Sequence, residues 1–197
     1  MFSLITIFGL FHLGCGDFSK LEGRIDLANQ SWCRASQSQR VERVLDGDTV
    51  EFNDPDLGMV KVRLLGAAAP ETEKPDAPEE CFGNESWWFL EELILGQVVK
   101  FEYDVECTDI YGRDLSWLVL QGQDPEIARL MSLYQVPGLY DDGSYDLLVN
   151  EFLVRLGYAT VYDGELDKSE RYQSRLETAE GLAEAEGLGG WLECTDF

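Results

Sequence analysis

The side chains available for acid–base or nucleophilic chemistry in this chain are mainly carboxylates and arginines. Its 197 residues include one histidine, His12, which lies in an apolar N-terminal segment that we expect to be removed. Without that imidazole the chain has no Ser-His-Asp triad, no Cys-His dyad and no histidine ligand for a metal ion. Any catalysis must therefore use carboxylates, arginines, hydroxyls, thiols or a metal ion held by oxygen atoms.

The overall charge argues against non-specific binding to polyanions. The chain has 38 acidic and 15 basic residues and a formal net charge of −23. Nucleic acids and anionic lipids both attract positive surfaces, so this acidity opposes such binding. A hydrophobic content of 45% and an aromatic content of 12% exclude intrinsic disorder. The sequence therefore predicts a folded, strongly acidic domain.

The first 14 residues, MFSLITIFGLFHLG, are predicted to be a signal peptide. As a helix they would reach about 21 Å, less than the ~30 Å hydrocarbon core of a bilayer. The run that ends in Leu13-Gly14-Cys15 resembles a bacterial lipoprotein signal, which implies lipid attachment at Cys15 and a tether over residues 15–38. We therefore expect an exported protein anchored in the cell envelope. The alternative is an ordinary secretory signal and a secreted protein.

Four further cysteines remain in the exported chain. An even number in an exported protein predicts two disulfides, and none of the four has the CxxC spacing of a zinc or thioredoxin site. Of the three connectivities, we favour Cys33–Cys194, which joins the two ends, and Cys81–Cys107, which joins two loops.

Short strands followed by helices would position the chemically active side chains. Alternating apolar residues predict five strands, over 40–45, 49–52, 60–64, 99–103 and 115–119. Asp46-Gly47-Asp48 is a tight-turn sequence between the first two strands, and a helix over 84–95 follows the third. This order predicts an α+β domain built on a five-stranded Greek-key barrel of the OB type.

Three more helices are expected after the barrel. Asp124-Pro125 predicts the start of a short helix that ends near residue 134, and a loop follows over 135–144. Apolar residues at helical spacing predict the next helix over 149–156, with Gly157 at its end. The last helix is expected over about 168–186, with one apolar face and one acidic, solvated face.

In this order, the segments resemble the staphylococcal nuclease (thermonuclease) family over residues 39–191. They are RVLDGDTVEF (43–52), VRLLGAAAPET (62–72), FGNES (82–86), CTDIYGRDLSWL (107–118), LVNEFLVRLGYATV (148–161) and LETAEGLAEAEGLGGW (176–191). DGDT alone is common. The four motifs DGDT, RLL…PE, TDxYGR and VNxxLVxxG, in this order at family-like spacing, are specific. The resemblance places the nuclease-like domain at 39–197, with an insertion at about 123–143.

The resemblance implies a calcium-dependent phosphodiesterase, an endonuclease that hydrolyses DNA or RNA. By matching position, Asp48 is a calcium ligand, Arg63 and Arg113 bind the scissile phosphate, and Glu71 acts as the general base or orients it. Guanidinium groups and a hard dication stabilise the charge that builds on phosphoryl oxygens, and a carboxylate can deprotonate water without histidine. We interpret Tyr111 as a packing residue at the barrel edge.

Two positions depart from the family pattern. The second calcium aspartate falls at Ala68 and the threonine after it falls at Ala69. Calcium takes six to eight oxygen ligands and binds more tightly as carboxylates are added. We therefore expect the Ca²⁺ site to be weakened or altered, or to accept another divalent metal.

Three hypotheses remain open at this point. The first is an envelope-anchored nuclease with nucleic acid as its substrate and a membrane contact through the lipid only. The second is a catalytically inactive OB-fold module that binds a nucleotide, a nucleic acid or a protein, and the third is a structural lipoprotein. The sequence predicts no particular protein partner. Convergence of Arg63, Glu71 and Arg113 in one cleft would favour the enzyme, whereas arginines paired away from Asp48 would favour the inactive module.

Overall fold

The computed structural model describes residues 33–75, 77–122, 125–139, 146–162, 164 and 171–197. They belong to one compact unit, Ser31–Phe197. The predicted signal peptide, Cys15 and Asp124 lie outside the described residues. Within the described part of the chain, no helix is both long enough and apolar enough to cross a membrane.

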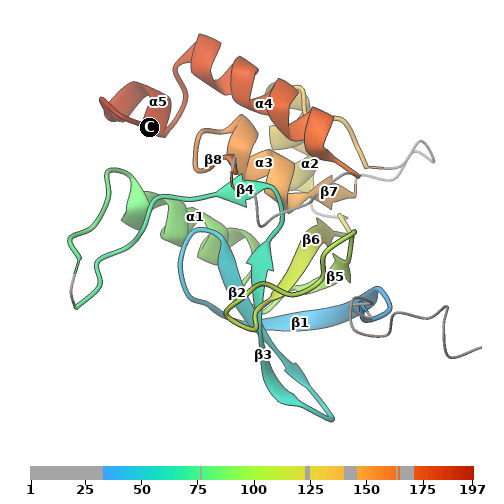
Figure 1. The fold of residues 1–197 in the computed structure, drawn as a ribbon. Helices are drawn as coiled ribbons and strands as arrows, with labels where there is room; N and C mark the ends of the chain where they lie inside the picture. Colours follow the sequence, from blue (N-terminus) through green and yellow to red (C-terminus); the bar gives the residue numbers. More distant parts are fainter. Residues whose placement is uncertain (1–32, 76, 123–124, 140–145, 163, 165–170) are drawn as a thin grey trace, which may run out of the picture. The chain divides into compact units, whose positions relative to one another are not determined.

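Five strands close into a barrel (Figure 1). They are β1 (Gln37–Val44), β2 (Thr49–Asp54), β3 (Gly58–Leu64), β5 (Val98–Glu102) and β6 (Asp114–Leu120). The order is β3-β2-β1-β5-β6 with antiparallel neighbours, and β3 also pairs with β6 in parallel, so the sheet closes on itself. A register irregularity between Val41 and Arg43 bends β1 from its pairing with β5 to its pairing with β2. The predicted α+β fold on an OB-type barrel is confirmed.

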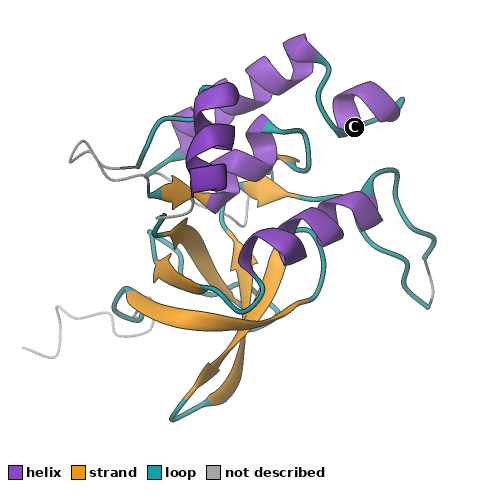
Figure 2. Cartoon of the chain, turned by 180° about the vertical axis from the view of Figure 1, so that it is seen from behind, coloured by secondary structure: helices purple, strands orange, loops and turns teal. Residues whose placement is uncertain are grey.

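The helices lie beside and above the barrel (Figures 1 and 2). They are α1 (Gly83–Ile94), α2 (Pro125–Leu133), α3 (Val149–Arg155), α4 (Gln173–Glu186) and α5 (Gly190–Glu193). Three short strands complete the fold: β4 (Ala67–Ala68) pairs with β8 (Thr160–Val161), and β7 (Leu147–Leu148) extends the sheet from β6. In both views α3 lies between the barrel and α4.

Burial differs from the sequence pattern in the central elements. The alternation in β6 suggests one wet face, but every residue of Leu115–Leu120 is buried because α3 covers the outer face of this strand. All seven residues of α3 are buried as well. In α4, Leu176, Ala179 and Ala183 form the predicted buried face, and the helix begins at Gln173. The predicted start near 168 lies outside the described residues.

Asn150 is the polar residue that fastens α3 to the barrel. Its side chain is fully buried, and its Oδ1 accepts the backbone N–H of Leu118 at 2.9 Å. Its Nδ2 donates to the carbonyl of Leu65 at 2.8 Å. One amide thereby satisfies buried backbone groups at the end of β3 and in the middle of β6.

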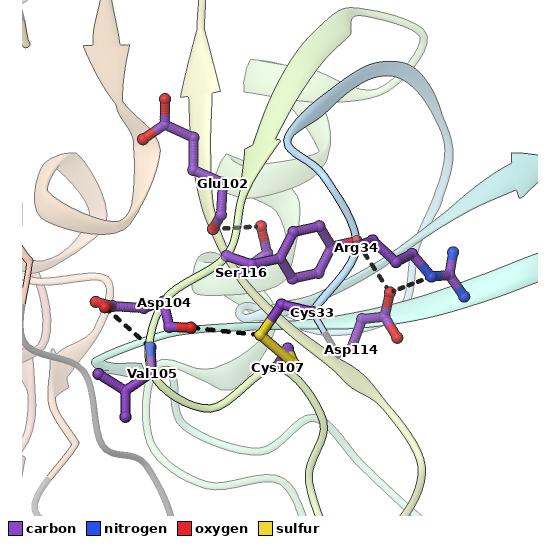
Figure 3. The surroundings of a disulfide bond; sticks show 9 residues. Cys33, Arg34, Glu102, Asp104, Val105, Cys107, Asp114 and Ser116 are labelled. Atoms are coloured by element: carbon purple, nitrogen blue, oxygen red, sulfur yellow. Dashed lines mark hydrogen bonds and ion pairs between the residues drawn. A yellow bond between two sulfur atoms is a disulfide. The ribbon is translucent and has the colours of Figure 1, made fainter. Parts of the chain in front are cut away.

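The structure confirms two disulfides and corrects their pairing. Cys33 bonds to Cys107 with a Cα–Cα distance of 5.1 Å (Figure 3). Cys81 bonds to Cys194 with a Cα–Cα distance of 5.9 Å. The predicted Cys33–Cys194 and Cys81–Cys107 pairs are wrong. Because β1 and β5 are antiparallel, the segment before β1 lies beside the segment after β5. Cys33 belongs to the first segment and Cys107 to the second. The remaining bond joins the loop before α1 to the end of α5.

Replacing Asn150 by alanine is expected to lower the free energy of unfolding by about 2–4 kcal/mol, because it leaves buried N–H and C=O groups without partners. The exposed Asn53→Ala in β2 is the matched control and is expected to stay within ~0.5 kcal/mol of the parent. Urea unfolding measures both. Equal stabilities of the two variants would contradict this role for Asn150.

Candidate active site

One cavity of about 330 Å³ brings the four predicted site residues together. Asp48 comes from the β1–β2 turn, Arg63 from the end of β3, Glu71 from the segment after β4 and Arg113 from the β5–β6 loop. The other lining residues are Asp46, Ala68, Ala69, Lys74, Asp109, Ile110, Tyr111, Leu115 and Tyr162. Convergence at one end of the barrel is the arrangement that the nuclease hypothesis requires.

The Asp46-Gly47-Asp48 turn is held by its own side chains and by a close backbone approach. Asp46 Oδ1 accepts the Asp48 N–H at 3.1 Å. A Cβ at Gly47 would lie 2.5 Å from the Cβ of Ala69 and 2.8 Å from that of Ser86. Only glycine therefore lets the turn pack against α1 and against the segment that leads to Glu71.

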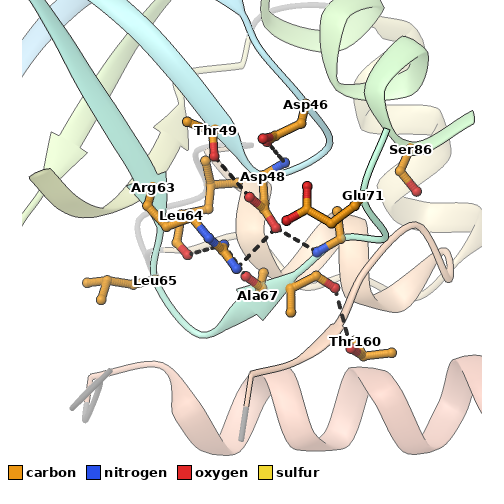
Figure 4. Close-up of polar contacts among 12 residues, drawn as sticks. Asp46, Asp48, Thr49, Arg63, Leu64, Leu65, Ala67, Glu71, Ser86 and Thr160 are labelled. Atoms are coloured by element: carbon orange, nitrogen blue, oxygen red, sulfur yellow. Dashed lines mark hydrogen bonds and ion pairs between the residues drawn. The ribbon is translucent and has the colours of Figure 1, made fainter. Parts of the chain in front are cut away.

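Asp48 is buried, and three donors hold its carboxylate (Figure 4). Its Oδ2 accepts the Ala69 N–H at 2.7 Å and lies 3.1 Å from Arg63 Nη2. Its Oδ1 accepts the Thr49 hydroxyl at 3.0 Å. Burial raises the pKa of Asp48 to about 7, although Arg63 acts in the opposite direction.

Arg63 has a fixed orientation. Its Nη1 donates to the carbonyls of Leu64, at 3.0 Å, and of Ala67. Its guanidinium carbon lies 5.9 Å from the centre of the Tyr162 ring, and its side chain is only 14% exposed. Arg63 therefore presents a pre-organised planar cation to the cavity.

Arg113 is oriented by Asp109, which lies on the same loop. Arg113 Nε lies 2.6 Å from Asp109 Oδ2, and Asp109 Oδ1 accepts the N–H groups of Tyr111 and Arg113, each at 2.9 Å. Burial opposes ionisation of Asp109, but the hydrogen bonds from Arg113 outweigh it, so the pKa of Asp109 is lowered. The interpretation of Tyr111 as a packing residue is wrong, because its side chain sits on this turn and is 78% exposed.

Glu71 lies at the rim of the cavity. Its carboxylate is about half exposed and is 2.5 Å from Lys74 Nζ. Its backbone N–H donates to the Glu80 carboxylate, and its carbonyl accepts the Glu80 N–H, both at 2.9 Å. The backbone of Glu71 is therefore fixed, while its side chain faces solvent with a cation beside it.

The three cations of the cavity, Arg63, Lys74 and Arg113, each pair with a carboxylate. The ion pair of Arg63 is with Asp48 itself, inside the cavity. An arginine paired away from Asp48 would indicate an inactive module. Arg113, which pairs with Asp109, meets this criterion, and Arg63 does not.

The residues present do not complete a calcium site. The two least exposed carboxylates of the cavity are Asp48 and Asp109, and both oxygens of each already contact protein donors. Ala68 supplies no carboxylate where the family pattern has its second aspartate. No group of three or more Asp, Glu, Cys or His side chains arranged for a metal ion occurs among the described residues. Calcium needs six to eight oxygens, so we derive no chemical step through it.

Sequence reasoning missed Lys74 and Asp109 as members of the site and did not assign Tyr162 to it. A signal existed for Asp109, because Asp two residues before Tyr111 and three before Gly112 is typical of a turn in which Asp caps backbone N–H groups. Lys74 and Tyr162 lie on irregular segments, so no periodicity indicated which way their side chains point.

The fold and the cavity define an OB-fold barrel protein with two oriented guanidinium groups in one cavity. The chain belongs to the staphylococcal nuclease family, because residues 61–193 match the family model described as "Staphylococcal nuclease homologue".

Three relatives illustrate the similarity. A protein named Thermonuclease from Staphylococcus intermedius is 40% identical over 84 residues, which cover 43% of this chain and 49% of the relative. Endonuclease YhcR of Bacillus subtilis (strain 168) is 31% identical over 160 residues, 78% of this chain and 11% of that protein. An uncharacterized endonuclease of Escherichia coli O157:H7 is 35% identical over 124 residues, 63% of this chain and 60% of the relative. The match to the thermonuclease spans about half of that relative's length.

The raised pKa of Asp48 predicts a pH-dependent effect of Asp48→Asn on stability. The folded state keeps the proton of Asp48 up to about pH 7, whereas the unfolded chain releases it near the ordinary aspartate pKa of 3.8. Stability from this group is therefore present below about pH 4 and is lost as the pH rises through 7. The Asn variant lacks this loss, so its Tm should rise relative to the parent between pH 4 and 8. Thermal unfolding in chelator measures this, and a pH-independent difference would contradict it.

Proposed function

We propose that this protein hydrolyses phosphodiester bonds of DNA or RNA in the cavity formed by Asp48, Arg63, Glu71 and Arg113. The observation that carries the proposal is the convergence of two oriented arginines and a rim carboxylate at one end of an OB barrel. Family membership and the names of the relatives, a thermonuclease and an endonuclease, support a nucleic-acid substrate.

In the proposed mechanism the two arginines bind the non-bridging oxygens of one phosphate. Arg63 is directed by Asp48 and by two carbonyls, and Arg113 by Asp109, so neither guanidinium must reorganise when charge builds on the phosphoryl oxygens. Glu71 takes the proton of the attacking water as the new P–O bond forms, the bond to the leaving ester oxygen breaks, and that oxygen takes a proton from solvent. The half-exposed position of Glu71 gives it access to water. Lys74 Nζ donates to Glu71 Oε2 at 2.5 Å, and this hydrogen bond raises the pKa of Lys74, so a cation stays beside Glu71.

The substrate must enter a cavity of a strongly acidic protein. The lining contains three cations and the four carboxylates Asp46, Asp48, Glu71 and Asp109, so the arginines act through fixed short contacts and not through a broad positive field. Single strands suit such a site, since one phosphate can approach without a duplex beside it. Salt favours the encounter by screening the long-range repulsion, with a Debye length of about 8 Å at 0.15 M.

We also propose that the protein acts outside the cytoplasm, anchored through Cys15 or secreted. The two disulfides support this, because such bonds persist in oxidising compartments.

A divalent cation, where one contributes, is proposed to bind weakly beside Asp48, since Ala68 offers no second carboxylate.

The test is cleavage of single-stranded DNA and RNA by the full chain in Ca²⁺, Mg²⁺, Mn²⁺ or chelator. Arg63→Lys and Arg113→Lys are each expected to lower kcat/KM by about 10²-fold, because lysine lacks the planar fork of donors. The matched control is Arg129→Lys, at an exposed arginine of α2 that pairs with Glu126 outside the cavity, and its kcat/KM should stay at the parent value.

Ala68→Asp separates a weak nuclease from an inactive module. A second carboxylate beside Asp48 should raise cleavage in Ca²⁺ and leave the rate in chelator unchanged. A folded parent that cuts neither substrate under any condition would contradict the proposal. Activity confined to Ala68→Asp would then identify a scaffold that only binds.

A further inference from the structure

Lys74 is a cation of the active-site cavity that the nuclease motifs do not include. Its backbone N–H donates to the Ala77 carbonyl at 3.0 Å and its carbonyl accepts the Ala77 N–H at 3.2 Å, so a tight turn fixes the main chain. Its Nζ donates to Glu71 Oε2 at 2.5 Å, and the side chain is half exposed. An ammonium has three N–H donors, so the contact with Glu71 leaves two for other acceptors in the cavity.

The two arginines of the cavity already have carboxylate partners. Arg63 Nη2 lies 3.1 Å from Asp48 Oδ2. Arg113 Nε lies 2.6 Å from Asp109 Oδ2. The lining contains two further carboxylates, and among the described lining residues Lys74 is the cation that remains to balance them.

Lys74 lies within electrostatic range of the β1–β2 turn. The hydrogen bond with Glu71 is the main cause of the raised pKa of Lys74. The charges of Asp46 and Asp48 raise this pKa further. Figure 4 shows the carboxylates of Asp46, Asp48 and Glu71 gathered around the turn. The ammonium therefore acts on the same carboxylates that a divalent cation beside Asp48 would neutralise.

A divalent cation meets two obstacles beside Asp48. Ala68 and Ala69 have no side-chain oxygen, and both carboxylate oxygens of Asp48 already accept protein donors. The ion would also approach the ammonium of Lys74, and like charges repel. The cavity thus lacks a second anionic ligand and holds a cation of its own.

We propose that the Lys74 ammonium takes over the electrostatic role of a divalent cation in this cavity, so that phosphodiester cleavage does not require a bound metal ion. This role rests on the nuclease function proposed above. Water attacks phosphorus, its proton passes to Glu71, the bond to the leaving ester oxygen breaks, and that oxygen takes a proton from solvent. As Glu71 is neutralised, negative charge builds on the phosphoryl oxygens, and the ammonium then stabilises those oxygens. Lys74 thereby stabilises the transition state more than the bound substrate.

The test measures cleavage of single-stranded DNA and RNA by the oxidised full chain, in chelator and in Ca²⁺. We expect the parent to cut in chelator at a rate within about threefold of its rate in Ca²⁺, because the residues present do not complete a calcium site. Lys74→Gln should lower kcat in chelator by about tenfold or more with little change in KM, since the charge acts mainly in the transition state.

Two further variants separate the charge of Lys74 from a merely structural role. Lys74→Arg keeps the charge and should retain most of the parent kcat in chelator. Lys61→Gln, at an exposed lysine of β3 that does not line the cavity, is the matched control and should keep the parent value. The Tm should stay at the parent value in all three variants, because exposed or half-exposed lysines contribute little to stability.

Calorimetric titration with Ca²⁺ supplies a readout besides activity. Ala68→Asp combined with Lys74→Gln should bind Ca²⁺ about fivefold or more tightly than Ala68→Asp alone, because the repelling ammonium is removed. Ala68→Asp combined with Lys61→Gln should bind as Ala68→Asp alone does. Equal Kd values for all three proteins would show that Lys74 does not act where the metal ion binds, and would overturn the proposal.

The cleavage data separate failure of this proposal from failure of the nuclease function. A parent that cuts in Ca²⁺ but not in chelator would overturn the role of Lys74 and leave the nuclease function standing. A rate in chelator that Lys74→Gln leaves unchanged would have the same meaning. A folded parent that cuts in neither condition would contradict the nuclease function and this role with it.

Discussion

The buried contact between Asp48 and Arg63 is the interaction on which the cavity depends. It joins the β1–β2 turn to the end of β3, and through the Ala69 N–H it also fixes the segment that leads to Glu71. Burial disfavours the charge on Asp48, so the carboxylate is retained at a cost that Arg63 only partly offsets. A buried carboxylate whose charge lowers the stability of the fold is typical of a functional site.

The two arginines reach the cavity by different structural means. Arg63 lies in a strand whose register is set on both sides, by Thr49 of β2 and Leu115 of β6. Arg113 lies on a loop that Asp109 holds from within and that the Cys33–Cys107 bond ties to the chain before β1. The site thus combines a rigid barrel edge with a cross-linked loop, and this explains how a small domain orients two guanidinium groups.

Much of this arrangement follows from the sequence, because strand alternation and four ordered motifs fix the barrel and the positions of Asp48, Arg63, Glu71 and Arg113. The remainder depends on tertiary neighbours. Disulfide pairing required the register of β1 with β5, which cysteine spacing does not contain. Tyr111 was misjudged because an aromatic residue is usually buried, whereas here it lies on a turn whose conformation Asp109 imposes. Burial of both faces of β6 depends on α3, whose place over that strand no local pattern reveals.

The most direct test of the central claim is a double-mutant cycle on the affinity for a short single-stranded oligonucleotide, with Arg63→Lys, Arg113→Lys and the double variant. If both guanidinium groups bind one phosphate, the two effects are coupled, and we predict a coupling energy of about 1 kcal/mol or more. Strictly additive effects, or affinities equal to that of the parent, would contradict the account, because the two arginines would then not share a ligand.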